Sequence, residues 1–129
     1  MKKTAQEITE LSRAHGVLAK QFYVIFTTPT GGLGPILDNM KDHLEFQMSL
    51  EKQGIMFAAG PNWTADGQSW EGDGMVVVRA KSIDDAKAIA ARDPMHVRGA
   101  RKYSVRPWMI NEGTINVRLD YSTGKFHIE

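Results

Sequence analysis

The sequence FYVIFTT at residues 22–28 and the sequence MVVV at residues 75–78 consist mainly of apolar residues with aromatic or β-branched side chains. Such runs are typical of β-strands. Because successive side chains of a strand point to opposite faces of its sheet, both strands would present apolar side chains on both faces. We therefore expect a sheet that is covered on both sides.

Predicted helices and further strands surround these two runs in the sequence. An apolar stripe at helical spacing precedes Gly54, which is placed as a helix-ending glycine. Ser82 is placed as a helix cap with Asp85 three residues later, and Pro94 ends that helix. The predicted strands are 22–28, 55–59, 74–79 and 103–110, and the predicted helices are 36–53 and 82–93. The order β-α-β-β-α-β is that of the ferredoxin-like unit, so we expect an α+β fold with an antiparallel sheet.

The two ends of the chain are predicted to be extra elements. Ile8, Leu11 and Leu18 recur at helical spacing within residues 4–20, which indicates an amphipathic helix. Residues 114–120 and 125–128 alternate as the strands of a hairpin would. We therefore divide the chain into an N-terminal helical arm over residues 1–21, an α+β domain over residues 22–112, and a C-terminal β-hairpin extension over residues 113–129.

The expected number of helices bears on assembly. Two helices can cover only one face of the sheet, and both faces are apolar. The sheet of a second copy would cover the other face and produce a symmetric homodimer, or a higher homo-oligomer. Alternatively, the N-terminal helix or the C-terminal hairpin covers that face within one chain. We favour the dimer, and we expect the apolar stripe of the arm to pack on the body or on the partner.

Composition excludes several classes of protein. The chain has 16 basic and 15 acidic residues, a balance that argues against nucleic-acid binding through a basic face. It has no cysteine, which excludes disulfides and thiolate chemistry. No apolar stretch approaches the ~20 residues of a membrane span. Lys2 and Lys3 are not followed by the apolar run of a secretory signal, so we expect a cytoplasmic protein.

His43 and Asp93 are the candidate catalytic residues. His43 lies beside the apolar stripe of the first predicted helix, and Asp93 lies at the end of the second. Both helices of a split βαβ unit lie on one face of the sheet, so these side chains can meet. A histidine held by a carboxylate makes a general base near neutral pH. The alternatives are a boundary histidine with one hydrogen bond and an aspartate that ends a helix.

Two further patterns point less clearly to a site. His96 follows Asp93 by three residues, but together with His43 the spacing matches no known zinc motif. The Gly31-Gly32-Leu33-Gly34 loop precedes a helix, yet it lacks the full dinucleotide fingerprint and the lysine of a P-loop. We therefore expect neither a metal nor a cofactor, and we interpret the loop as a flexible connector or a lid.

Aromatic side chains offer a pocket for a ring-shaped ligand. Trp63, Trp70 and Trp108, with Phe57, could line an apolar pocket, although packing in the core would explain them as well. Arg106 stands beside Pro107 and Trp108, where it could meet an anionic group or a surface carboxylate.

Several short motifs occur in the order found in the YciI-like (YCII-related) family. They are His43-Leu44, Ala58-Ala59-Gly60-Pro61, the alanine-rich segment 82–91, Asp93-Pro94 and Val105-Arg106-Pro107-Trp108. The segment 22–112 resembles this family, and the two ends of the chain are additions to it. The resemblance implies a dimeric α+β barrel and a catalytic role for His43 and Asp93. One characterised branch of the family removes chloride from a chlorinated hydroxyhydroquinone.

We expect a small-molecule enzyme that uses a His–Asp acid/base dyad for proton transfer, elimination or isomerisation on a small aromatic or lactone-like substrate. His43 would be the acid/base and Asp93 its orienting partner. The residues expected to contact the substrate are Gly60, Pro61, Trp63, Arg106 and Trp108. Two alternatives remain: a non-catalytic metabolite-binding or stress-related accessory protein, and a dimerisation module without a ligand.

Overall fold

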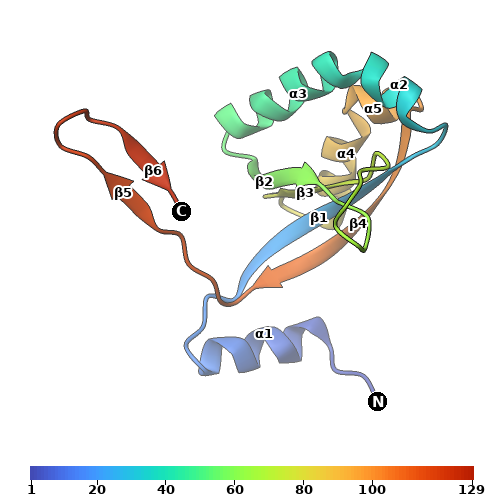
Figure 1. The fold of residues 1–129 in the computed structure, drawn as a ribbon. Helices are drawn as coiled ribbons and strands as arrows, with labels where there is room; N and C mark the ends of the chain where they lie inside the picture. The colour runs from blue at the N-terminus through green and yellow to red at the C-terminus, as the bar shows by residue number, and fades with distance from the viewer. The chain divides into compact units, whose positions relative to one another are not determined.

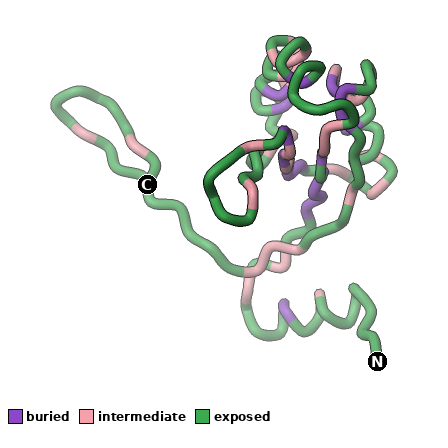
Figure 2. Tube along the Cα trace, turned by 45° about the vertical axis from the view of Figure 1, so that its right-hand side comes forward, coloured by how far each residue is buried: buried purple, intermediate pink, exposed green.

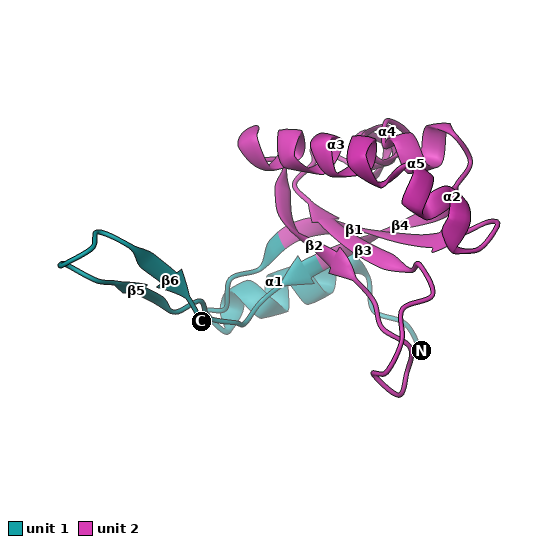
Figure 3. Ribbon diagram, turned by 45° about the horizontal axis from the view of Figure 1, so that its top comes forward, with its two compact units in different colours: residues 1–20, 109–129 teal, residues 21–108 magenta.

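The computed structural model describes residues 1–129, and the chain forms two compact units. One contains residues 21–108, and the other contains residues 1–20 with residues 109–129. Figure 3 shows the two units in different colours. Buried residues are concentrated in the sheet and helices of residues 21–108 (Figure 2). None of the helices is both long enough and apolar enough to cross a membrane.

A four-stranded sheet is the base of the larger unit (Figure 1). Its strands are β1 (Lys20–Pro29), β2 (Met56–Pro61), β3 (Gly74–Val78) and β4 (Arg101–Ile110). Their order across the sheet is β2-β3-β1-β4, and β3 runs antiparallel to both β1 and β2. This is the strand order of the ferredoxin-like α+β fold, so the predicted fold class is confirmed.

Helices cover one face of this sheet (Figures 1 and 3). They are α2 (Leu33–Asp38), α3 (Met40–Lys52), α4 (Ile83–Ala91) and α5 (Pro94–Val97). The main core lies between the sheet and these helices and consists of Tyr23, Ile25, Leu50, Val76, Val78, Ala86, Ile89 and Ala90. A smaller cluster of Ile36, Met95 and Ala100 lies beside it.

The single helix predicted over residues 36–53 is wrong. The chain forms a helix from Leu33, leaves helical geometry at Asn39 and resumes at Met40. The Asn39 side chain donates a hydrogen bond to the carbonyl of Pro35 at 2.8 Å, which is the local competition with the helix that asparagine offers. The break matters for function because it sets where α3 begins, and His43 lies in the first turn of α3.

The smaller unit contains helix α1 (Ala5–Ala14) and the hairpin of β5 (Val117–Leu119) and β6 (Phe126–Ile128). Thr4 and Glu7 form a reciprocal capping box at the start of α1. The helix is ten residues long and ends at Ala14, earlier than the 4–20 predicted, because Gly16 and Ala19 adopt positive φ. Leu11 and Leu18 remain more than half exposed in the single chain, so their burial by a second subunit stays a prediction.

Candidate active site

Asp93 is held in place by the start of α5. It is the residue that caps this short helix, and its Oδ1 accepts a hydrogen bond from the backbone N–H of Met95 at 2.9 Å. Pro94 occupies the first helical position, where its missing N–H costs nothing. The cap therefore fixes the direction of the carboxylate, and only 5% of the Asp93 side chain is exposed.

His43 approaches this carboxylate from α3. Its Nδ1 lies 2.8 Å from Oδ2 and 3.0 Å from Oδ1 of Asp93. Gln47 stands one helical turn further along α3, on the same face as His43, and its Nε2 donates to Oδ2 of Asp93 at 3.2 Å. The structure thus brings together the two residues that the sequence proposed as a dyad and adds an amide to them.

The surroundings of Asp93 favour its charged form. Burial acts to raise the pKa of Asp93, but the hydrogen bond and the charge of His43 and the N–H of Met95 act more strongly in the other direction. The net effect places the pKa of Asp93 below its ordinary value. An ionised carboxylate can only accept hydrogen bonds, so Nδ1 of His43 carries the proton. In a neutral ring, Nε2 of His43 then has a free lone pair.

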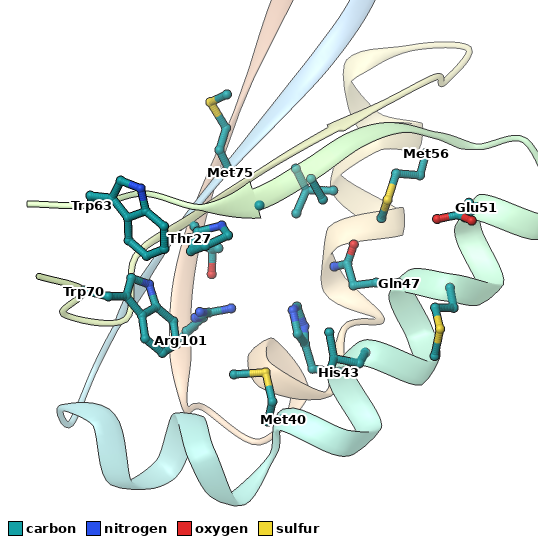
Figure 4. Close-up of a pocket in the computed structure, with 17 residues that line it drawn as sticks. Thr27, Met40, His43, Gln47, Glu51, Met56, Trp63, Trp70, Met75 and Arg101 are labelled. Carbon is teal, nitrogen blue, oxygen red and sulfur yellow. The ribbon is translucent and has the colours of Figure 1, made fainter. Parts of the chain in front are cut away.

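His43 lies on the wall of a pocket with a volume of about 490 Å³. Figure 4 shows this pocket between α3 and the sheet. Trp63 and Trp70 contribute two aromatic walls from the loop between β2 and β3, and Met40, Leu44 and Met48 contribute an apolar wall from α3. A cavity of this size with few polar groups is typical of small-molecule sites.

The structure sorts the other residues predicted for the site into two groups. Gly60, Pro61, Trp63 and Trp70 line the His43 pocket. Arg106 and Trp108 do not; they lie with Val24 and Phe26 around a separate hollow of about 340 Å³. The reason is strand alternation, because Val105 packs into the helix-covered core and its neighbour Arg106 must point to the opposite face. Phe57 lies away from the pocket, with its ring 4.8 Å from that of Phe22.

His96 is engaged by the protein through both ring nitrogens. Its Nδ1 lies 2.6 Å from the carbonyl oxygen of Ala90, and its Nε2 lies 2.9 Å from Oγ1 of Thr27. Burial lowers the pKa of His96, against the opposing effects of Ala90 and Asp93. No three metal-binding side chains are grouped as a metal site would require. The glycine-rich loop at residues 31–34 contributes nothing to the pocket wall.

Four polar residues of the pocket wall escaped the sequence analysis: Thr27, Gln47, Glu51 and Arg101. Gln47 could have been found, since it follows His43 by one helical turn. Thr27 and Arg101 line the same pocket from β1 and β4, which are distant in sequence from α3. Only the sheet order, which places β1 and β4 side by side, brings these two residues to the site.

Comparison with known proteins places this architecture in a family. The model of the YCII-related domain matches residues 21–109. The chain belongs to the YCII-related domain family. No curated protein matches the sequence. Among solved structures, this YCII-related chain is similar to 5-chloro-2-hydroxyhydroquinone dehydrochlorinase from Burkholderia phenoliruptrix AC1100, which was solved in complex with 2,5-dihydroxybenzoquinone.

The likeness to the dehydrochlorinase is one of fold. The two proteins are 22% identical, and their structures align with a TM-score of 0.55. The alignment covers 67% of this chain and 92% of the dehydrochlorinase. The family match concerns the α+β unit that carries His43 and its pocket.

Proposed function

We propose that this protein is a small-molecule enzyme in which Nε2 of His43 acts as a general acid/base on a ring-shaped substrate. The observation that carries the proposal is the pairing of His43 with Asp93 at 2.8 Å on the wall of a pocket of about 490 Å³. A general base must have a lone pair within reach of the substrate. With Nδ1 bound to the carboxylate, Nε2 is the nitrogen available for that role.

Asp93 would orient the ring and stabilise the imidazolium that forms during proton transfer. In an elimination, Nε2 would take a proton from the substrate, the electron pair of the broken bond would enter the ring, and the leaving group would depart with its own bonding pair. In an isomerisation, the same nitrogen would return the proton to another atom. The activity of the structural neighbour, a dehydrochlorination, belongs to the first of these two classes.

Turnover of a small substrate panel tests the proposal. Halogenated hydroxyhydroquinones, including 5-chloro-2-hydroxyhydroquinone, and small unsaturated lactones would be followed by chloride release and by ultraviolet absorbance. The variant His43→Ala should lower kcat/KM by at least about 100-fold, the range seen when an acid/base group is removed. Asp93→Asn should lower it as well, since the amide neither accepts from Nδ1 as strongly nor stabilises the imidazolium.

A second His–Asp pair of the chain supplies the matched control. His127 lies 2.8 Å from Asp120, and both side chains are about two-fifths exposed. His127→Ala should leave kcat/KM unchanged. Binding of ring compounds without any turnover that depends on His43 would contradict the enzyme and would favour the metabolite-binding alternative.

We also propose that the chain is a homodimer. On the sheet face that the helices do not cover, Phe26, Phe57 and Trp108 are each more than one third exposed. Exposed aromatic side chains that gather on one face are typical of an interface. The sheet of a second copy has matching chemistry, and two such sheets would together form the dimeric α+β barrel expected from the sequence.

A further inference from the structure

Arg101 is a buried cation without an anionic partner. Only 6% of its surface is exposed, and its guanidinium points into the pocket on the side facing His43 (Figure 4). Nε and Nη2 both donate to one acceptor, the carbonyl oxygen of Gly72, at 3.0 and 2.7 Å. None of the ion pairs of the chain includes Arg101. A buried arginine normally has a charged partner.

The contact with Gly72 explains only part of this arrangement. It ties β4 to the loop before β3, where a side chain in place of Gly72 would lie 2.5 Å from Pro29. The acceptor is a single neutral carbonyl, and the carboxylates of Asp93 and Asp73 attract the guanidinium without forming an ion pair with it. The contact with Gly72 also leaves Nη1 without any protein acceptor. This nitrogen belongs to a pocket-lining residue, so a ligand in the pocket is the acceptor it lacks.

The nearby carboxylates do not pair directly with Arg101. Asp93 and Asp73 both attract its charge, but Asp93 already receives hydrogen bonds from His43, Gln47 and Met95, and neither carboxylate forms an ion pair with Arg101. Glu51 also lines the pocket, but it is exposed and lies at the other end from Arg101 (Figure 4). Arg101 is the one lysine or arginine among the residues that line the pocket.

A second unpaired polar atom belongs to another residue of the pocket wall. Oε1 of Gln47 is buried and has no hydrogen-bond partner, although Nε2 of the same amide is bound to Asp93. Leaving a buried acceptor without a donor destabilises a protein. This oxygen is closed to the pocket space, so a ligand in the pocket meets the guanidinium of Arg101 and not this atom.

We propose that Arg101 is the anion-binding subsite of this pocket, and that the substrate class is a small ring compound carrying a carboxylate or an ionised hydroxyl group. The anionic oxygen of the ligand binds Nη1 of Arg101. This inference rests on the proposed function for the location of the site, but it concerns recognition rather than turnover. Arg101 then fixes the ring in the pocket opposite His43.

Two pairs of probes test the subsite and distinguish its two possible anions. Benzoate and benzamide have the same shape and differ in charge; 4-nitrophenolate and 4-nitroanisole differ in the same way at an ionised hydroxyl. Binding to the full chain is measured by quenching of tryptophan fluorescence, since Trp63 and Trp70 line the pocket. One charged probe should bind at least about tenfold more tightly than its neutral counterpart, as a charge-assisted hydrogen bond implies.

Variants of two arginines test whether Arg101 is responsible for the tighter binding of the charged probe. Arg101→Gln should bring the ratio of the two affinities close to one. Arg79→Gln is the matched control, because Arg79 also donates to backbone carbonyls, those of Gly54 and Met56, but does not line the pocket. It should keep the wild-type ratio. Arg101→Lys serves if Arg101→Gln does not fold, and it should reduce the ratio because an ammonium lacks the planar fork of a guanidinium.

A wild-type ratio of one for both probe pairs, or no binding of any probe, would overturn the subsite. So would a ratio that survives in Arg101→Gln and Arg101→Lys. If neither variant folds, resonances of the guanidinium nitrogens decide: the charged probe should shift those of Arg101 and leave those of Arg79 unmoved, and the reverse result refutes the proposal. His43→Ala should lose turnover and keep the ratio. If the wild type prefers the charged probe but turns over no substrate, the proposed function is refuted and the anion-binding subsite is not.

Discussion

Nδ1 of His43 lies 2.8 Å from Oδ2 of Asp93, and the other oxygen of the same carboxylate caps helix α5 through the N–H of Met95. One side chain thus serves the fold and the candidate site together. The cap holds the carboxylate still, and the carboxylate holds the imidazole. The helix cap thus determines, through Asp93, which ring nitrogen of His43 carries the proton. Because Asp93 also stabilises the fold, its ionisation affects the free energy of unfolding, which can be measured.

Asp93→Asn should destabilise the protein at neutral pH by about 1–3 kcal/mol, the range for losing a charged hydrogen-bond partner. The pKa of Asp93 lies below its ordinary value of 3.8 in the folded chain. Folding therefore favours the ionised form, and this stabilisation is complete above the unfolded pKa and is lost as the pH falls through the folded pKa. Urea unfolding between about pH 6 and pH 2 should show the gap between wild type and variant closing with acid.

Asp120→Asn provides the comparison for that experiment, because it removes an exposed carboxylate from a histidine. It should change the free energy of unfolding by less than about 0.5 kcal/mol, as is usual for surface positions. A constant gap between wild type and Asp93→Asn across the whole pH range would show that the charge of Asp93 does not stabilise the fold.

His96 should make the folded state sensitive to mild acid. Burial lowers the pKa of His96 below 6.5, so the folded chain favours the neutral ring, which is bound to Ala90 and Thr27. For this group the stabilisation is complete above the unfolded pKa and is lost as the pH falls towards the folded pKa. The free energy of unfolding of the wild type, measured with guanidinium chloride, should therefore fall from about pH 7 to pH 5.

The variant His96→Gln should flatten that pH dependence, because glutamine does not titrate. His15→Gln is the control, since His15 is exposed after α1. An equal loss of stability with acid in wild type and His96→Gln would assign the effect to another group.

The two tryptophans of the pocket should divide into a structural and a ligand-contacting residue. Trp70 donates its indole N–H to the carbonyl of Asp73 at 2.8 Å and packs on the cluster of Ile36 and Met95. Trp63 is 62% exposed. Trp70→Ala should therefore cost about 2–4 kcal/mol of unfolding free energy, and Trp63→Ala less than about 0.5 kcal/mol. Both variants should weaken the binding of the charged probe that Arg101 prefers, benzoate or 4-nitrophenolate, in calorimetric titrations; unaltered binding in both would place the ligand elsewhere.

The elements of the α+β unit follow from local signals in the sequence. Local residue patterns are enough to predict the apolar strands at residues 22–28 and 75–78 and the helix end at Gly54. None of these signals depends on a contact with a distant part of the chain. The break at Asn39 went unseen because the apolar stripe continues across it, while the interruption comes from one side-chain hydrogen bond to Pro35.

A site residue could be predicted only where the sequence of its own helix or strand marks it. His43 stands out on α3, and the alternation of a strand would have excluded Arg106 had its register been known. Arg101 could not be found, because its importance depends on its surroundings in the fold: a carbonyl on a distant loop is its acceptor, and no carboxylate forms an ion pair with it. Burial and unpaired groups are properties of the folded chain, which residue types do not disclose.

Assembly gives a last prediction, which depends on the sheet face opposite the helices. The protein should have twice the 14.4 kDa mass of the chain in dilute solution, because Phe26 and Trp108 otherwise expose aromatic area on one face. Trp108→Glu should shift the mass towards that of the monomer by placing a charge in an apolar interface. Leu37→Glu is the control, since Leu37 is 61% exposed on helix α2 and lies away from this face; it should leave the mass unchanged. Light scattering at micromolar concentration measures all three proteins, and a wild type at 14.4 kDa would contradict the dimer.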